Sequence, residues 1–178
     1  MEVFDHDSWQ TPQWLFAALN AEFDFALDVA ASENHHLCNQ YFTQQDSALD
    51  KSWLLSIKGL VPRLTAFCNP PYSRGSKEKF LAKAADEMRN GITSVFLVPA
   101  LPSEGWFPWS TASEVRFITN GRVNFINPVT KTEIKGCPAG SCIVIFNPYH
   151  HGLVKVTTAD RNELRKFGEA LINKAVVA

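Results

Sequence analysis

Four residues that follow a short apolar stretch carry the most chemical information in this sequence. They are Asn69, Pro70, Pro71 and Tyr72, within "FCNPPYS". The prolines fix φ and lack N–H groups, so the carbonyl of Pro70 is held in place with few competing partners. The side-chain oxygen of Asn69 adds a second acceptor, and Tyr72 offers a flat face. Two acceptors and a ring suit a planar group with an NH₂, such as the exocyclic amine of a base.

A second polar motif stands at the end of another apolar stretch. Asp28 lies in "LDVAAS", and the small residues Ala30, Ala31 and Ser32 follow it. Small side chains let a ligand approach the backbone, and a carboxylate supplies an anion for a cationic group. A solvated aspartate at the end of a strand is the alternative interpretation. The sequence has no GxGxxG motif, so it does not indicate a dinucleotide site.

Two other stretches hold further polar or aromatic candidates. In "DSWQTPQWLF", Trp9 and Thr11 stand just before a helical pattern. Thr11 is expected to be the N-cap of that helix, and Pro12 its first residue. In "QQDSALDKSW", Asp46 lies near a turn. Each of these features, taken alone, is also typical of a purely structural role.

The hydrophobic pattern predicts the elements that position these motifs. Apolar residues at helical spacing predict helices over 11–23, 77–91 and 158–175. Apolar runs of strand length predict strands at 25–30, 65–68, 92–99, 113–118, 122–126, 141–146 and 153–157. Residues 31–60 are expected to be irregular, with short helical turns at most.

The order of these elements predicts an α/β protein. Helices and strands alternate in the first half of the chain, and strands dominate afterwards. We therefore expect a sheet that is parallel in its first part and has an antiparallel edge formed by residues 113–157. In an open α/β sheet, ligands bind at the carboxyl ends of the strands, which is where Asn69 and Asp28 fall.

Composition narrows the functional class further. The chain has 178 residues, enough for one domain with a full core. Its net charge is −1, so any nucleic-acid contact needs a local basic patch rather than an overall positive excess. No apolar run is long enough to span a membrane, and "MEVFDHDSWQ" lacks a signal-peptide pattern. We therefore expect a cytoplasmic protein without a membrane span.

The cysteines do not indicate a metal site. Cys38, Cys68, Cys137 and Cys142 include no CxxC pair, and no paired Cys/His element has the spacing of a zinc site. We expect them to be small, buried, apolar residues in a reducing compartment. No metal is predicted.

The ordered set of motifs resembles the phage-type Dam family. This family comprises DNA N6-adenine methyltransferases that use S-adenosylmethionine. The resemblance rests on W-x-T-P-x-x-L-F, L-D-V-A-A-S, D-S-A-L with a later Trp, and C-N-P-P-Y-S, and it continues through "LVPA", "EVRFITNGRVNF" and "GSCIVIFNP". It implies a Rossmann-like methyltransferase fold, with a mostly parallel sheet and antiparallel edge strands. It also implies a phage or prophage enzyme in the bacterial host cytoplasm, connected with restriction–modification.

The same resemblance implies roles for individual residues. Asn69, Pro70, Pro71 and Tyr72 form the catalytic motif: the Asn69 oxygen and the Pro70 carbonyl accept hydrogen bonds from adenine N6, and Tyr72 stacks on the extruded base. The residues implied to bind the cofactor are Trp9, Thr11, Pro12, Asp28, Ala30, Ala31, Ser32 and Asp46. Asp28 would hold the methionine part and Asp46 would contact the cofactor's adenine. The usual glycine-rich turn is absent, and only Glu33 and Asn34 are available for the ribose.

Two alternatives to methylation of duplex DNA stay open. NPPY also occurs in methyltransferases that act on glutamine or on RNA bases, and an inactive fold could serve as a nucleic-acid binding module. With one domain expected over 1–178 and no separate recognition domain, target recognition falls to the loops, which are 101–112, 120–140 and 33–60. Phosphate contacts are expected from some of four basic residues in or beside 113–140, which are Arg116, Arg122, Lys131 and Lys135. The oligomeric state is not indicated.

Overall fold

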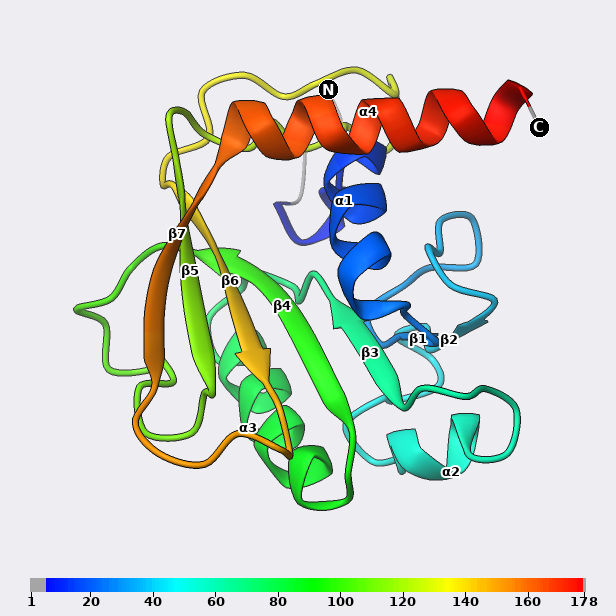
Figure 1. Cartoon of the computed structure of the whole chain (residues 1–178), viewed down its shortest axis with the longest axis vertical. Coiled ribbons are helices and arrows are strands. Elements are labelled where there is room, and N and C mark those ends of the chain that lie inside the picture. The colour runs from blue at the N-terminus through cyan, green and yellow to red at the C-terminus, as the bar shows by residue number, and fades with distance from the viewer. Residues whose placement is uncertain (1–5, 178) are drawn as a thin grey trace.

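A seven-stranded β-sheet runs through the computed structural model, which describes residues 6–177 (Figure 1). A short 3₁₀ helix, η1 (His6–Ser8), precedes the first long helix. The helices are α1 (Gln13–Phe23), α2 (Trp53–Ile57), α3 (Ser76–Arg89) and α4 (Arg161–Val177). The strands are β1 (Leu27–Asp28), β2 (Gln40–Tyr41), β3 (Thr65–Cys68), β4 (Thr93–Pro99), β5 (Glu114–Thr119), β6 (Ser141–Phe146) and β7 (Lys155–Asp160).

The strand order is β2-β1-β3-β4-β6-β5-β7. The first four strands in this order pair in parallel, and β7 pairs in parallel with β5. Strand β6 is antiparallel to both β4 and β5. The predicted α/β fold with a mostly parallel sheet is therefore confirmed. The antiparallel pairing comes from β6, which lies inside the sheet, while the edge strand β7 is parallel to its neighbour.

One predicted strand is absent, and one observed strand was not predicted. Residues 122–126 form no ladder strand in the described part of the chain. Ile126 makes only isolated bridges, with Gln10 and Glu133. Strand β2 lies in a segment that was expected to be irregular, and it pairs with β1 over only two residues.

Helices cover both faces of the sheet, which explains why its central strands β3, β4 and β6 are largely apolar and buried. In β4, Val95 and Leu97 pack in one cluster with residues of α1 and α4. Phe96 and Val98 point the other way and pack with residues of α2 and α3. All four side chains are fully buried. A strand that is buried on both faces reads as a continuous hydrophobic run rather than an alternating one.

The helix termini differ in part from the predicted caps. The N-cap of α1 is Pro12, and its carbonyl accepts hydrogen bonds from the N–H groups of Leu15 and Phe16 at 3.1 Å each. Thr11 is therefore not the N-cap, and its side chain is buried. At α4, the Asp160 carboxylate accepts from the N–H groups of Asn162 and Glu163 and so caps the helix.

Helix α4 crosses α1 at Gly168, where the two backbones come very close. A Cβ atom at Gly168 would lie 1.9 Å from the carbonyl oxygen of Trp14, far inside van der Waals contact. The obstacle is backbone, so it cannot turn away as a flexible side chain would. Gly168 therefore sets how closely α4 approaches α1, and α1 follows directly on the segment that reaches the functional site.

We predict that Gly168→Ala destabilises the protein, although Gly→Ala inside an exposed helix normally stabilises by about 1 kcal/mol. The added methyl must push α4 away from α1, and forced overpacking costs about 1–3 kcal/mol. Urea denaturation measures the effect. Ala170→Ser on the exposed face of α4 is the control and should stay within about 0.5 kcal/mol of wild type. A Gly168→Ala protein as stable as wild type would contradict the close approach.

Candidate active site

A cavity of about 780 Å³ opens beside the carboxyl ends of β1 and β3. Its walls come from segments that are distant in the sequence. Residues 7–11, which we call the N-terminal strap, line one side, and residues 28–35 after β1 line another. The loop after β3 and the start of α3 complete it. This is the edge at which α/β sheets bind ligands.

Asn69 lies at the end of β3 with its side chain at the cavity wall. Its Nδ2 donates a hydrogen bond to the carbonyl oxygen of Trp9 in the strap, at 3.0 Å. Because that bond uses the NH₂ group, the acceptor Oδ1 is the atom left over. Oδ1 is buried, and within residues 6–177 it has no hydrogen-bond partner. A buried acceptor without a partner is costly, so it signals a donor that arrives with a ligand.

The rest of the motif divides between the cavity and the core. Pro71 lines the cavity, and Pro70 is buried. The Tyr72 ring meets Phe125 edge-on, with centroids 5.9 Å apart and the planes at 85°. Burial raises the pKa of its phenol well above the usual value, so the hydroxyl stays neutral. Tyr72 itself is not among the cavity-lining residues, and its side chain packs against the buried cluster that contains Phe125.

Asp28, the last residue of β1, places a buried carboxylate on the cavity wall. Its side-chain oxygens accept from the N–H groups of Ala30 at 3.3 Å and Leu37 at 3.0 Å. Burial raises its pKa from 3.8 to about 6 despite these bonds. No lysine or arginine of the described chain forms an ion pair with it. A positively charged ligand group would supply the missing partner.

The structure brings most of the other predicted cofactor residues to the same cavity. Trp9, Thr11, Ala30, Ala31 and Ser32 all line it, and so do the two positions considered for the ribose, Glu33 and Asn34. The hydroxyl of Thr11 is buried, and no atom of the described residues forms a hydrogen bond with it. Its burial beside the cavity leaves a polar group next to the site with no partner among those residues.

Two predicted residues lie away from the cavity. Pro12 is buried at the start of α1. The Asp46 carboxylate accepts from the backbone N–H of Thr43 at 2.9 Å and from its hydroxyl at 2.8 Å, and it lies 3.8 Å from Lys51. Residues next to Asp46 in the sequence do line the cavity, namely Gln44, Gln45, Ser47 and Ala48. The segment therefore reaches the site, although the Asp46 side chain turns back on its own loop.

The sequence interpretation missed several residues that line the cavity. Asp7, Ser8 and Gln10 belong to the strap, and their position in the sequence next to Trp9 was the available signal. His35 also lines it, and burial is the main cause that lowers its pKa from 6.5. A single histidine in a polar stretch gives no sign of this role, because its burial depends on the fold.

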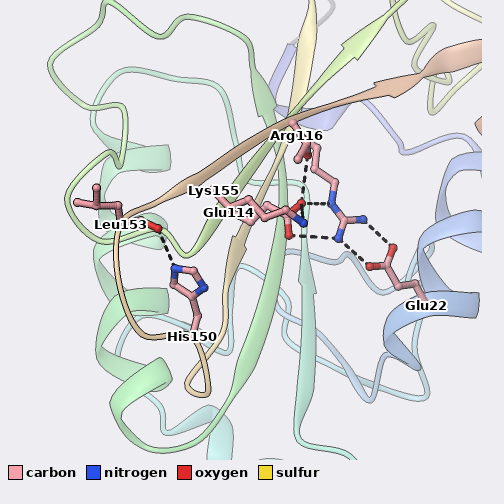
Figure 2. Close-up of polar contacts among 7 residues, drawn as sticks. Glu22, Glu114, Arg116, His150, Leu153 and Lys155 are labelled. Atoms are coloured by element: carbon pink, nitrogen blue, oxygen red, sulfur yellow. Dashed lines mark hydrogen bonds and ion pairs between the residues drawn. The ribbon is translucent and has the colours of Figure 1, made fainter.

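Arg116, one of the predicted phosphate contacts, is already paired (Figure 2). Its guanidinium binds both carboxylate oxygens of Glu22 at 2.7 Å each and one oxygen of Glu114 at 2.9 Å. It also lies over the Phe23 ring, 5.6 Å from the centroid. A bidentate pair of this kind fixes the guanidinium and neutralises its charge. The interaction joins α1 to β5 and gives Arg116 a structural role, while a phosphate contact at this residue stays a prediction.

The other three basic residues lie in the loop between β5 and β6. Arg122 donates to the carbonyl of Cys137. Lys131 is exposed, and its Nζ lies 3.5 Å from the side-chain oxygen of Gln10 in the strap. Lys135 is exposed as well. Neither lysine forms an ion pair with a described residue, and Lys131 lies beside the cavity-lining Gln10.

Residues 6–177 contain neither a membrane-spanning helix nor a metal-binding cluster. No helix there is long and apolar enough to cross a membrane. No group of three or more His, Cys, Asp or Glu side chains in that range is arranged to hold a metal ion.

The family of the chain follows from comparison with known proteins. A family model described as DNA N-6-adenine-methyltransferase (Dam) matches residues 1–171. The chain belongs to the Dam family. It is therefore an adenine-specific DNA methyltransferase by family, and the motifs that lie around the cavity are the ones that resembled this family in the sequence.

Two phage proteins are similar to this Dam-family chain along most of its length. The DNA N-6-adenine-methyltransferase of Escherichia phage T1 is 29% identical over 168 residues, covering 85% of this chain and 67% of the phage protein. The enzyme of the same name from Haemophilus phage HP1 (strain HP1c1) is 28% identical over 170 residues, covering 92% of each. The family match over residues 1–171 spans the strap, the Asp28 segment and the Asn69 motif together.

We predict that Asp28 makes the ligand-free protein less stable as the pH rises. Its folded pKa of about 6 exceeds the ordinary 3.8, so its contribution is fully present below pH 3.8 and is lost as the pH rises through about 6. Between about pH 5 and pH 8 the loss should be about 1–2 kcal/mol. Denaturation of wild type and Asp28→Asn at both pH values measures it.

The difference between the two proteins isolates Asp28, because His35 titrates in both of them. Burial lowers the pKa of His35, so its stabilisation is lost as the pH falls, opposite in sign to that of Asp28. Relative to wild type, Asp28→Asn should gain stability between pH 5 and pH 8. A difference that stays constant with pH would show that the Asp28 carboxylate is ionised throughout.

Proposed function

We propose that this protein transfers a methyl group from S-adenosylmethionine to the exocyclic N6 amine of an adenine that has left the duplex stack. The observation that carries the proposal is the buried, unpartnered Oδ1 of Asn69, beside the cavity that also holds the Asp28 carboxylate. One atom is suited to an incoming NH₂ group and the other to an incoming cation. Both lie at the carboxyl edge of adjacent parallel strands.

The residues around the cavity fit S-adenosylmethionine. Asp28 would bind the ammonium of its methionine part, because this carboxylate is buried and paired only with N–H groups among the described residues. Ala30, Ala31 and Ser32 present little side-chain bulk along the same wall. A cavity of about 780 Å³ is within the usual size for cofactors. When bound, the cofactor supplies an electrophilic methyl group.

Asn69 has the geometry to raise the nucleophilicity of adenine N6. The N6 lone pair is delocalised into the ring, so the amine is a poor nucleophile in the ground state. An acceptor on each N–H bond favours a tetrahedral nitrogen and stabilises the positive charge that develops on it. The Asn69 Oδ1 and the Pro70 carbonyl would provide these acceptors. Because Trp9 already fixes the Asn69 amide, little reorganisation is needed during the reaction.

Tyr72 would receive the face of the flipped base. A target inside a duplex is out of reach of a buried acceptor, so the nucleotide must rotate out of the stack at a cost of a few kcal/mol. Stacking on an aromatic ring returns about 1–3 kcal/mol per base. Phe125 meets the Tyr72 ring edge-on and would support it in this role.

We predict that Asn69→Ala lowers the methyl-transfer rate by about 10²–10³, the usual cost of removing one preorganised hydrogen bond. Affinity for S-adenosylmethionine should change little. Asn69→Asp keeps an acceptor and should retain partial activity. The assay is single-turnover transfer of labelled methyl groups to duplex DNA from cells that lack adenine methylation. Nucleoside mass spectrometry identifies the N6-methyladenine that forms. RNA and glutamine-containing peptides serve as alternative acceptors.

Two outcomes of this assay would contradict the proposal. Labelling of RNA or peptide without formation of N6-methyladenine in DNA would show that the substrate is RNA or protein and not DNA. Full activity of Asn69→Ala would make the motif structural, with Oδ1 facing the cavity for no catalytic reason.

We predict that Asp28→Asn weakens S-adenosylmethionine binding about 10–100-fold while the fold persists. Removing the charge from a hydrogen bond to a cation forfeits about 1.5–3 kcal/mol. Calorimetric titration measures the affinity. Asp86→Asn, which changes an exposed carboxylate on α3, is the matched control and should bind as wild type does. Equal affinity in the two variants would remove Asp28 from the cofactor site.

We predict that Lys131→Ala and Lys135→Ala each weaken binding to all DNA sequences and lower the salt slope by about one unit. Both ammonium groups are exposed in the loop between β5 and β6. DNA affinity measured against salt concentration provides the test. Lys58→Ala, at the C-terminal end of α2, is the control because α2 lies at the opposite edge of the sheet (Figure 1). If only Lys58→Ala changes the slope, DNA binds elsewhere.

A further inference from the structure

The peptide bond between Tyr72 and Ser73 is held from both of its polar ends. The N–H of Ser73 donates to Oδ1 of Asp7 at 2.7 Å. The carbonyl oxygen of Tyr72 accepts from Nζ of Lys77 at 3.5 Å. These two groups belong to one peptide unit, so an acidic and a basic side chain clamp the same plane. Asp7 comes from the strap and Lys77 from the first turn of α3.

Lys77 occupies a place that a lysine does not normally favour. Its side chain is only 11% exposed, and it lies in the first turn of a helix, where the macrodipole disfavours a cation. Besides the Tyr72 carbonyl, the ammonium contacts the Trp106 ring, 5.1 Å from its centroid, and Glu78 at 3.9 Å. Desolvation of the Lys77 ammonium beside the Asn69 motif therefore costs free energy, and the hydrogen bond to the Tyr72 carbonyl offsets part of this cost.

The motif needs such a clamp because it has few anchors of its own. Pro70 and Pro71 have no N–H groups, so the loop cannot be fixed by backbone donors at these positions. The plane of the peptide after Tyr72 sets the backbone angle ψ of that residue, and with it the direction of the ring. Fixing this plane from both sides leaves the ring little freedom to rotate with the backbone.

We propose that Asp7 and Lys77 are positioning residues that orient Tyr72 toward the target base by clamping the Tyr72–Ser73 peptide. The inference rests on the proposed function, since it takes Tyr72 as the surface that receives the base. Asp7 also lines the cavity. The clamp therefore connects the cavity wall to the ring on the other side of the motif.

Amide exchange tests the clamp without any catalytic readout. Exchange at Ser73 N–H, measured by NMR, should accelerate in Asp7→Ala and in Lys77→Met. Asp7→Asn keeps a side-chain oxygen and Lys77→Arg keeps a cationic donor, so both should restore protection. Lys79→Met, an exposed lysine in the same turn of α3, should leave exchange unchanged. Unchanged exchange in Asp7→Ala and Lys77→Met would overturn the proposal.

Single-turnover methylation of unmethylated plasmid DNA tests the positioning role. Asp7→Ala and Lys77→Met should each lower the rate up to about 10²-fold, as expected when a reacting group is slightly misplaced. DNA affinity and its salt slope should stay as in wild type. In a Tyr72→Ala background, neither substitution should lower the rate further, because the ring that they orient is gone.

The alternative role for Lys77 is a direct contact with a DNA phosphate. If Lys77 made that contact, Lys77→Met would lower the salt slope by about one unit. Its effect on the methylation rate would also persist in the Tyr72→Ala background. Either result would overturn the proposal. A different result would contradict the proposed role of Tyr72 but not the clamp. In that result, Tyr72→Ala methylates DNA at the wild-type rate, while Asp7→Ala and Lys77→Met still accelerate exchange at Ser73.

Discussion

The hydrogen bond from the Asn69 amide to the Trp9 carbonyl decides which atom of that side chain faces the ligand. A reversed amide would present NH₂ to an incoming NH₂ group and could not accept from it. The strap that supplies the carbonyl lies 60 residues earlier in the chain and leads directly into α1. Helix α1 is in turn covered by α4, at the backbone contact with Gly168. The chemical orientation of one side chain therefore depends on the packing of two helices.

The sheet adds the second constraint, which is the nearness of an anion and an acceptor. Asp28 ends β1, Asn69 follows β3, and these strands are neighbours in parallel register, with Asp28 opposite Phe67. Neighbouring strands lie about 4.8 Å apart, so side chains at their carboxyl ends share one rim. Burial makes each group expensive to leave without a partner. The Asp28 carboxylate, which can bind a cation, and the Asn69 Oδ1 atom, which can accept a hydrogen bond, thus line the same cavity in the ligand-free protein.

The sequence was sufficient for the elements whose signals are local. Strand β3 was predicted with its observed bounds, because an apolar run stops at Asn-Pro-Pro. The strand predicted at 122–126 was wrong. Val123 and Phe125 alternate with polar residues because they are buried in the cluster against which Trp9 packs, and this burial does not require a strand. The pairing of Arg116 was not foreseen, because its partner Glu22 lies 94 residues away. Contacts between distant residues decide which polar groups are satisfied, and hydrophobic periodicity contains no information about them.

The position of β6 also affects how the chain folds during synthesis. Strand β5 contacts β6 and β7 but does not pair with β4, so both of its partners follow it in the sequence. On a ribosome, β5 emerges with both edges unpaired, and β4 likewise waits on one side until residues 141–146 appear. Unpaired apolar strand edges promote association with other chains. The unpaired edges of the nascent protein are therefore exposed while the loop between β5 and β6 emerges from the ribosome, and a pause in that interval prolongs the exposure.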